Sequence, residues 1–176
     1  MEGGAGMINE KMLNAMNEQV KHEMESAYLY LAMAAYFYSI NLPGMASWMK
    51  AQAHEEQVHA MKFYKHIIER NEDIKLMPIN LLGAKWDNVL STWKAAYDHE
   101  LFITGKIKDL MKIALETGDY SAMPLLNWFL DEQIEEEEQT LEVVNMLELA
   151  GTSGGTLILA DQGLGHRKPG EGSSFA

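Results

Sequence analysis

The sequence predicts an all-α protein, an antiparallel four-helix bundle with one long crossover and a short fifth helix at the C-terminal end. Four long segments place apolar residues at spacings of three, four and seven, the pattern of an amphipathic helix. The chain has four prolines, and they cluster at apparent boundaries between these segments. Two links between the segments are short and one is long, which determines how the helices are connected.

The predicted helices begin and end at recognisable boundary residues. A turn at Pro43 follows the first helix, Gly118 ends the third, and Pro124 fits only within the first turn of the fourth. Several glycines then precede a short apolar segment, 156–164, which is the predicted fifth helix. The four long helices are expected to cover residues 9–39, 45–70, 88–117 and 120–150.

The lengths of the links predict the order of the bundle. Helices of roughly 26–31 residues are about 40–45 Å long. The link 71–87 reaches about 56 Å when extended, so it is able to travel the whole length of the bundle. The second and third helices then run parallel, with an antiparallel hairpin on each side.

Length, composition and charge define the domain and exclude several functions. One domain is expected over residues 8–164, after a disordered extension, 1–7, and before a mobile tail, 165–176. The sequence has no cysteine, which excludes a disulfide framework and a thiolate metal site. The net charge of −12 argues against a nucleic-acid partner and suits cations. No apolar run is long enough to cross a membrane, and residues 1–6 lack the features of a signal peptide, so we expect a cytoplasmic protein.

Each predicted long helix carries one glutamate on its own apolar stripe, close to mid-length. A single such glutamate has an ordinary explanation, because it can lie at the edge of the stripe and reach water. Four edge placements at similar depth are far less expected, and no lysine or arginine lies on the stripes to form ion pairs. Two divalent cations would instead balance four buried carboxylates. These glutamates are Glu23, Glu56, Glu100 and Glu136.

The second helix adds a histidine to this set. His59 follows Glu56 by three residues, so the two side chains of this Glu-x-x-His pair share one helix face. A single histidine on such a face is more often a hydrogen-bonded core residue. Four carboxylates with one imidazole and no sulfur, however, suit iron or manganese better than zinc. Carboxylates shared between ions about 3.5–4 Å apart would bridge a two-metal site.

The acidic run 131–138 has two explanations. Such a run is usually a solvated helix face, and part of this one is expected to be. Glu132 and Glu136 nevertheless form a like-charge i,i+4 pair, which destabilises a bare helix. Glu132 and Glu135, together with Glu55 of the second helix, could therefore line a second, more exposed cation site.

Two aromatic residues lie near these candidate ligands. Tyr30 follows Glu23 by two helical turns on the same face, and Trp128 is adjacent to the stripe of the fourth helix. Core packing explains both positions. The alternative is a phenol or indole that supplies an electron to iron–oxygen chemistry.

The segments that carry these residues resemble those of the prokaryotic non-haem ferritins, in the same order and spacing. The similar segments lie within residues 8–164 and are EMESAYLYLAMAAYF, WMKAQAHEEQVHAMKFY, HELFITGKI and FLDEQIEEEE. The resemblance implies an iron-storage protein with ferroxidase activity. Such a protein oxidises Fe(II) to Fe(III) with O2 at a di-iron centre within each subunit. It then deposits ferric oxide inside a hollow shell of 24 copies.

The resemblance also implies a role for each candidate residue. Two irons per subunit would lie at the ferroxidase centre, with a third nearby. Tyr30 and Trp128 match aromatic positions beside the centre. The implied ligands are Glu23, Glu56 and His59 for the first iron; Glu56, Glu100 and Glu136 for the second, with Gln133 close by; and Glu55, Glu132, Glu135 and Glu136 for the third.

Two features separate this chain from haem-binding relatives, so no haem is expected. Gln133 and Glu136 stand where bacterioferritins carry a second Glu-x-x-His, and Gln57 stands where they carry a haem-binding methionine. Two other functions remain open on the residues alone. One is an oxidase that keeps its di-iron centre and acts on an organic substrate. The other is a structural bundle whose glutamates all lie at stripe edges.

Overall fold

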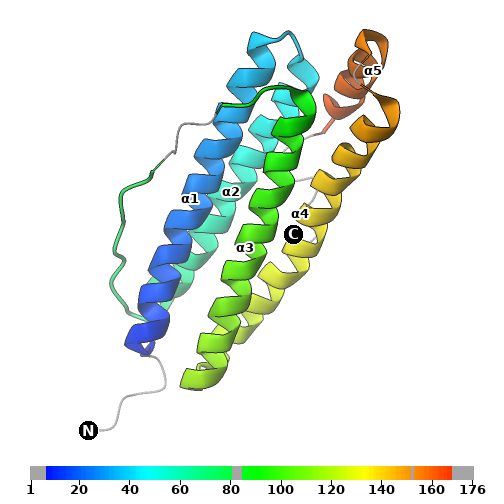
Figure 1. Ribbon diagram of the computed structural model, residues 1–176. Coiled ribbons are helices and arrows are strands. Elements are labelled where there is room, and N and C mark those ends of the chain that lie inside the picture. Colours follow the sequence, from blue (N-terminus) through cyan, green and yellow to red (C-terminus); the bar gives the residue numbers. More distant parts are fainter. Residues whose placement is uncertain (1–6, 81–84, 152, 168–176) are drawn as a thin grey trace, which may run out of the picture.

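A computed structural model describes residues 7–80, 85–151 and 153–167. Four long helices lie side by side in it, and a short helix packs at one end of the bundle (Figure 1). Within the described residues there is no strand, and the predicted all-α bundle is confirmed. The elements are α1 (Glu10–Ser39), α2 (Pro43–Glu69), α3 (Val89–Thr117), the 3-10 turn η1 (Tyr120–Ala122), α4 (Met123–Ala150) and α5 (Gly154–Leu164).

The helix boundaries follow local chemistry that the sequence displays. The Asn9 side chain accepts a hydrogen bond from the backbone of Lys11 at the start of α1, and Asn88 caps α3 through a capping box. Gly118 ends α3 with φ +70°, a left-handed conformation that glycine adopts without strain. The largest difference from the sequence prediction is at the fourth helix. Its first three residues form η1, and the α-helix begins at Met123 with proline in its first turn.

The crossover between α2 and α3 follows α1 from one end toward the other. Successive residues of the link contact Ile8, just before α1, and then successive residues of α1, so the link and α1 run in the same direction. Three hydrogen bonds show this order: the backbone of Ile8 donates to Glu72 (3.0 Å), that of Lys75 to Asn17 (2.7 Å), and that of Asn80 to Glu25 (3.1 Å). Helices α2 and α3 therefore run parallel, as the length of the link predicts (Figure 1).

The core consists of two apolar clusters separated by a buried polar layer. Along α1, Val20 belongs to one cluster and Tyr30 to the other, and Glu23 lies between them. Burying a large apolar side chain contributes about 1.5–3 kcal/mol, so the two clusters offset the cost of the polar layer. Large members of the clusters are Phe37, Trp48 and Trp93 on one side and Met16, Phe63 and Phe129 on the other.

The short helix α5 docks on the N-terminal end of α2. The Asp161 carboxylate accepts a hydrogen bond from the backbone of Met45 (2.7 Å), one of the N–H groups that a helix start leaves unpaired. Gly44 allows this contact, because a Cβ there would lie 1.8 Å from the Asp161 carbonyl oxygen. None of the described helices is both long enough and apolar enough to cross a membrane.

Candidate metal centre

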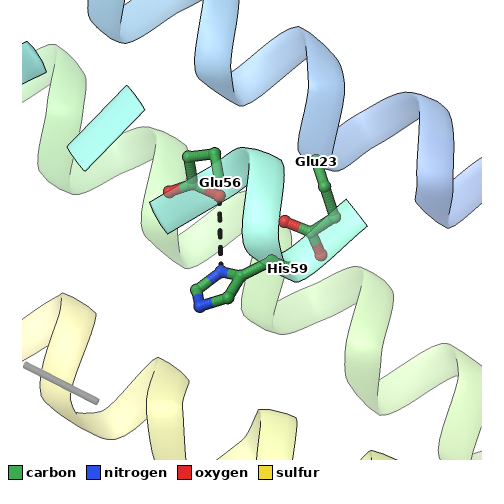
Figure 2. A group of neighbouring side chains, drawn as sticks. All are labelled: Glu23, Glu56 and His59. Carbon is green, nitrogen blue, oxygen red and sulfur yellow. Dashed lines mark ion pairs between the residues drawn. The ribbon is translucent and has the colours of Figure 1, made fainter. Parts of the chain in front are cut away.

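Three buried side chains from α1 and α2 converge in the polar layer. Glu23, Glu56 and His59 each offer an oxygen or nitrogen atom, and these atoms lie within 4.8 Å of one another. In Figure 2, Glu23 points from α1 toward the Glu-x-x-His pair of α2. The His59 Nδ1 atom lies 3.6 Å from Glu56 Oε2, and the three residues are at most 3% exposed. The prediction that Glu56 and His59 share one face is therefore confirmed.

Two further carboxylates reach the same layer from α3 and α4. Glu100 and Glu136 are 1% and 4% exposed. The Gln52 amide nitrogen donates to Glu56 Oε1 (3.0 Å) and to Glu136 Oε2 (2.7 Å), which places Glu136 beside the α2 pair. The Gln133 amide donates to Glu100 Oε2 (3.3 Å). The structure thus brings together one carboxylate from each long helix, as the sequence pattern indicates.

Amide and phenol groups hold these carboxylates in position. Gln19 donates to Glu23 Oε1 (2.7 Å), and the Tyr30 hydroxyl donates to Glu100 Oε1. The apolar stripes and the spacing of the acidic residues do not by themselves indicate Gln19 or the orienting role of Gln52. A signal for both exists, because each glutamine lies four residues before a stripe glutamate on the same helix face.

Burial and mutual repulsion favour the protonated form of most of these glutamates. Burial, reinforced by the charge of Glu56, raises the pKa of Glu100 to about 8. Burial and neighbouring carboxylates also raise the pKa of Glu23 and of Glu136 well above the ordinary value. Burial raises the pKa of the Tyr30 phenol in the same way, with Glu100 adding to it. The layer is therefore a poor place for four negative charges without cations.

The pKa values of Glu56 and His59 shift toward the charged forms, because the two groups lie close to each other. Burial alone would raise the pKa of Glu56, but His59 and the Gln52 amide bring it below the ordinary value. Burial alone would lower the pKa of His59, but the carboxylates of Glu132 and Glu56 raise it well above that of a free imidazole. Glu23 Oε2, by contrast, is buried and accepts no hydrogen bond from any described residue. An oxygen in that situation is suited to bind a cation.

The second acidic cluster lies next to this layer. Glu55 and Glu132 are buried, Glu135 is half-buried, and their charges act on one another. Glu132 Oε2 lies 3.7 Å from His59 Nε2, which joins the cluster to the centre. Glu55 has an ion pair that the sequence did not indicate, since it accepts a hydrogen bond from Arg167. Residues 168–176 of the predicted mobile tail lie outside the described residues.

Aromatic rings pack against the imidazole. Trp128 and Phe129 each lie edge-on to His59 with ring centroids 5.5 Å apart. The Lys62 ammonium group lies 3.9 Å above the Trp128 ring. These contacts restrict the orientation of His59, which a ligand to a metal requires.

The fold and this layer together define a class of protein: a four-helix bundle whose core holds carboxylates and a Glu-x-x-His pair suited to metal ions. A profile of the ferritin-like domain matches residues 13–150. The chain is 34% identical to the bacterial non-heme ferritin of Staphylococcus aureus (strain USA300) over 161 residues, 92% of this chain and 97% of that protein. It is 33% identical to the bacterial non-heme ferritin of Campylobacter jejuni over 89% of this chain and 93% of that protein.

Comparison with solved structures supports the same family. An open pore ferritin from the hyperthermophilic archaeon Archaeoglobus fulgidus superposes with a TM-score of 0.90 at 38% identity. The match covers 92% of this chain and 98% of that one. The chain therefore belongs to the ferritin family.

Proposed function

We propose that this chain stores iron, and that each subunit oxidises Fe(II) with O2 at a di-iron ferroxidase centre. The observation that carries the proposal is the polar layer itself. Four buried carboxylates, one from each long helix, surround one imidazole, and within the described residues no lysine or arginine pairs with them. Cations are the natural counter-charge for such a layer. Membership of a family whose bacterial relatives are named non-heme ferritins supports iron as the cation.

The residues divide between two iron positions. Glu23 and His59 would hold the first iron and Glu100 and Glu136 the second, with Glu56 between the two. Two Fe(II) ions release two electrons, which together with two protons reduce one O2 to hydrogen peroxide. Carboxylate ligands favour this oxidation because hard oxygen donors stabilise Fe(III) over Fe(II).

The fourth helix makes the second position weaker than the first. Gln133 stands on α4 with its amide 3.3 Å from Glu100, and it contributes no negative charge. A neutral side chain there would hold the second iron less tightly and let Fe(III) leave. Tyr30, whose hydroxyl donates to Glu100, is the nearest phenol to the proposed reaction and the candidate electron donor.

The proposal for storage further includes a third position and a shell. Glu55, Glu132 and Glu135, sharing Glu136, would bind a third iron on the way from the centre to the mineral. We propose a homo-oligomeric shell of 24 subunits in which ferric oxide accumulates. Exposed apolar side chains on α4 and α5 support assembly, since contact with other copies would cover them. They are Ile134, Leu149, Ile158 and Leu159.

Adding Fe(II) in air to the metal-free protein and counting the retained iron tests the proposal. Storage predicts on the order of hundreds of irons per assembly, far more than the about two per chain that a di-iron site holds. Retention of about two per chain with no mineral would indicate an oxidase of an organic substrate. Retention of none would indicate a structural bundle. The comparison variant is Glu23→Ala, which removes one proposed ligand of the first iron.

A further inference from the structure

An arginine from the C-terminal segment lies against the second acidic cluster. Arg167 follows α5, and its side chain is 11% exposed. Its Nη1 atom donates to Gln52 Oε1 (2.8 Å) and its Nη2 atom to Glu55 Oε2. The guanidinium carbon lies 4.2 Å above the Trp48 ring. Two hydrogen bonds and a stacked ring make this a defined binding place for a planar cation.

The fold delivers Arg167 to this place through the docking of α5. Asp161 is anchored to the start of α2, and the turn after α5 is closed by backbone hydrogen bonds from Gly165 to Asp161 (3.0 Å) and from Arg167 to Leu164 (3.3 Å). Gly165 approaches Gly44 closely, since a Cβ on it would lie 3.1 Å from the Gly44 Cα. The guanidinium therefore points along α2 toward Gln52 and Glu55.

The contacts of Arg167 extend to the di-iron ligands through one amide. Because Gln52 Oε1 accepts from Arg167, the Gln52 nitrogen faces the other way and donates to Glu56 and Glu136. Arg167 also carries the positive charge next to Glu55 and acts electrostatically on Glu135. A single side chain thus reaches both the second acidic cluster and the amide that orients the centre.

We infer that Arg167 is a built-in cation that binds Glu55 at the edge of the Glu55–Glu132–Glu135 cluster and competes with the third iron for that carboxylate. The inference rests on the proposed function, because it concerns the third position of the same site. A metal ion that binds Glu55 must displace the guanidinium from that carboxylate. Arginine keeps its charge at every ordinary pH, so the competition is permanent. The third position is accordingly weak, fills after the first two, and releases its iron readily.

The alternative is that Arg167 only anchors the C-terminal segment. Both explanations predict that Arg167→Gln loosens the end of α5. They differ in metal binding, because an anchor has no reason to change the affinity of the cluster. Arg167→Lys separates charge from shape, since lysine keeps the positive charge and loses the planar fork.

Calorimetric titration of the full-length, metal-free protein with Fe(II) under nitrogen tests the inference. Arg167→Gln is expected to raise the affinity for the third ion by about tenfold or more, the loss of one charge-assisted contact. The affinity of Arg167→Lys for the third ion is expected to stay close to that of the parent. Lys50→Gln is the matched control, because Lys50 is exposed on α2, the helix that carries Glu55, and its removal changes the net charge equally.

Each remaining outcome identifies which idea fails. A third-ion affinity in Arg167→Gln that equals or falls below that of the parent would overturn the inference, as would an Arg167→Lys titration that matches Arg167→Gln. A rise of the same size in Lys50→Gln would do so too, because general charge would explain it. If the parent itself binds fewer than two ions per chain, the proposed function fails instead.

Discussion

At the scale of single residues, the centre is built from groups that are costly to bury alone. Glu23, Glu100 and Glu136 all have raised pKa values because burial and neighbouring carboxylates disfavour their charged forms. The amides of Gln19, Gln52 and Gln133 donate hydrogen bonds to the layer but supply no charge. The residues are thus positioned to bind cations. Without cations, burial and mutual repulsion of these carboxylates lower the stability of the folded protein.

Replacing Glu100 with glutamine tests this cost. The pKa of Glu100 in the folded protein, about 8, lies above the ordinary glutamate value of 4.5, so the folded protein binds the proton more tightly than the unfolded chain. The contribution of Glu100 to stability is therefore full below about pH 4.5 and is lost as pH rises toward 8. At pH 7 we expect Glu100→Gln to leave the metal-free protein unchanged or to stabilise it by about 1–3 kcal/mol, while fast iron oxidation disappears.

Urea unfolding at pH 5, 7 and 8 measures the effect. The free energy of unfolding of Glu100→Gln, relative to that of the parent, should increase with pH in this series. A large loss of metal-free stability at pH 7 would contradict the account. It would show that the Glu100 carboxylate serves mainly in a structural network with Tyr30 and Gln133.

At the scale of elements, the docking of α5 on α2 depends on one glycine. The Gly44 backbone leaves no room for a Cβ beside the Asp161 carbonyl oxygen. Asp161 in turn satisfies the backbone of Met45 at the start of α2. One small residue, Gly44, therefore determines the position of α5 and, with it, that of Arg167.

Gly44→Ala is expected to destabilise the metal-free protein by about 1–3 kcal/mol, because the carbonyl of Asp161 is backbone and has to move. Gly105→Ala is the matched control. Gly105 is exposed within α3, and a Cβ there has nothing within 4 Å. Alanine should raise helix stability at that position by about 0.5–1 kcal/mol. Urea unfolding of both variants distinguishes the sites, and a shift of the same sign in each would contradict the docking argument.

Local patterns explain which elements and ligands were predictable. The 3.6-residue period and the boundary residues predict α1 to α4 closely, and the glutamates that interrupt the stripes predict Glu23, Glu56, Glu100 and Glu136. His59 follows from its spacing to Glu56. Arg167 was not predictable, because its contacts arise only after α5 docks more than a hundred residues away along the chain from Gln52. Its segment has no apolar period, so the sequence predicts a mobile tail there.

At the scale of the whole molecule, negative charge extends outward from the centre along α4. The net charge is −12, and the run 131–138 contains buried, half-buried and exposed acidic residues. Glu136 lies in the polar layer, Glu132 lies beside His59, and Glu135 is half-buried. In the proposed shell these residues form a path from the di-iron centre toward the mineral, and Arg167 lies next to that path.

Under the proposed function, the first two irons meet O2 without this path, whereas the path affects how quickly the centre empties. Changing Glu132 and Glu135 together to alanine should therefore leave the initial burst of about two irons per chain largely intact and slow later turnover. Asp131→Ala with Glu138→Ala is the matched control, since both residues are exposed on the same helix and carry the same total charge. Stopped-flow oxidation at about two and about fifty irons per chain makes the comparison. Progress curves identical to the parent at both loadings would remove the third position from the mechanism, whereas an equal slowing in the control would assign the effect to surface charge alone.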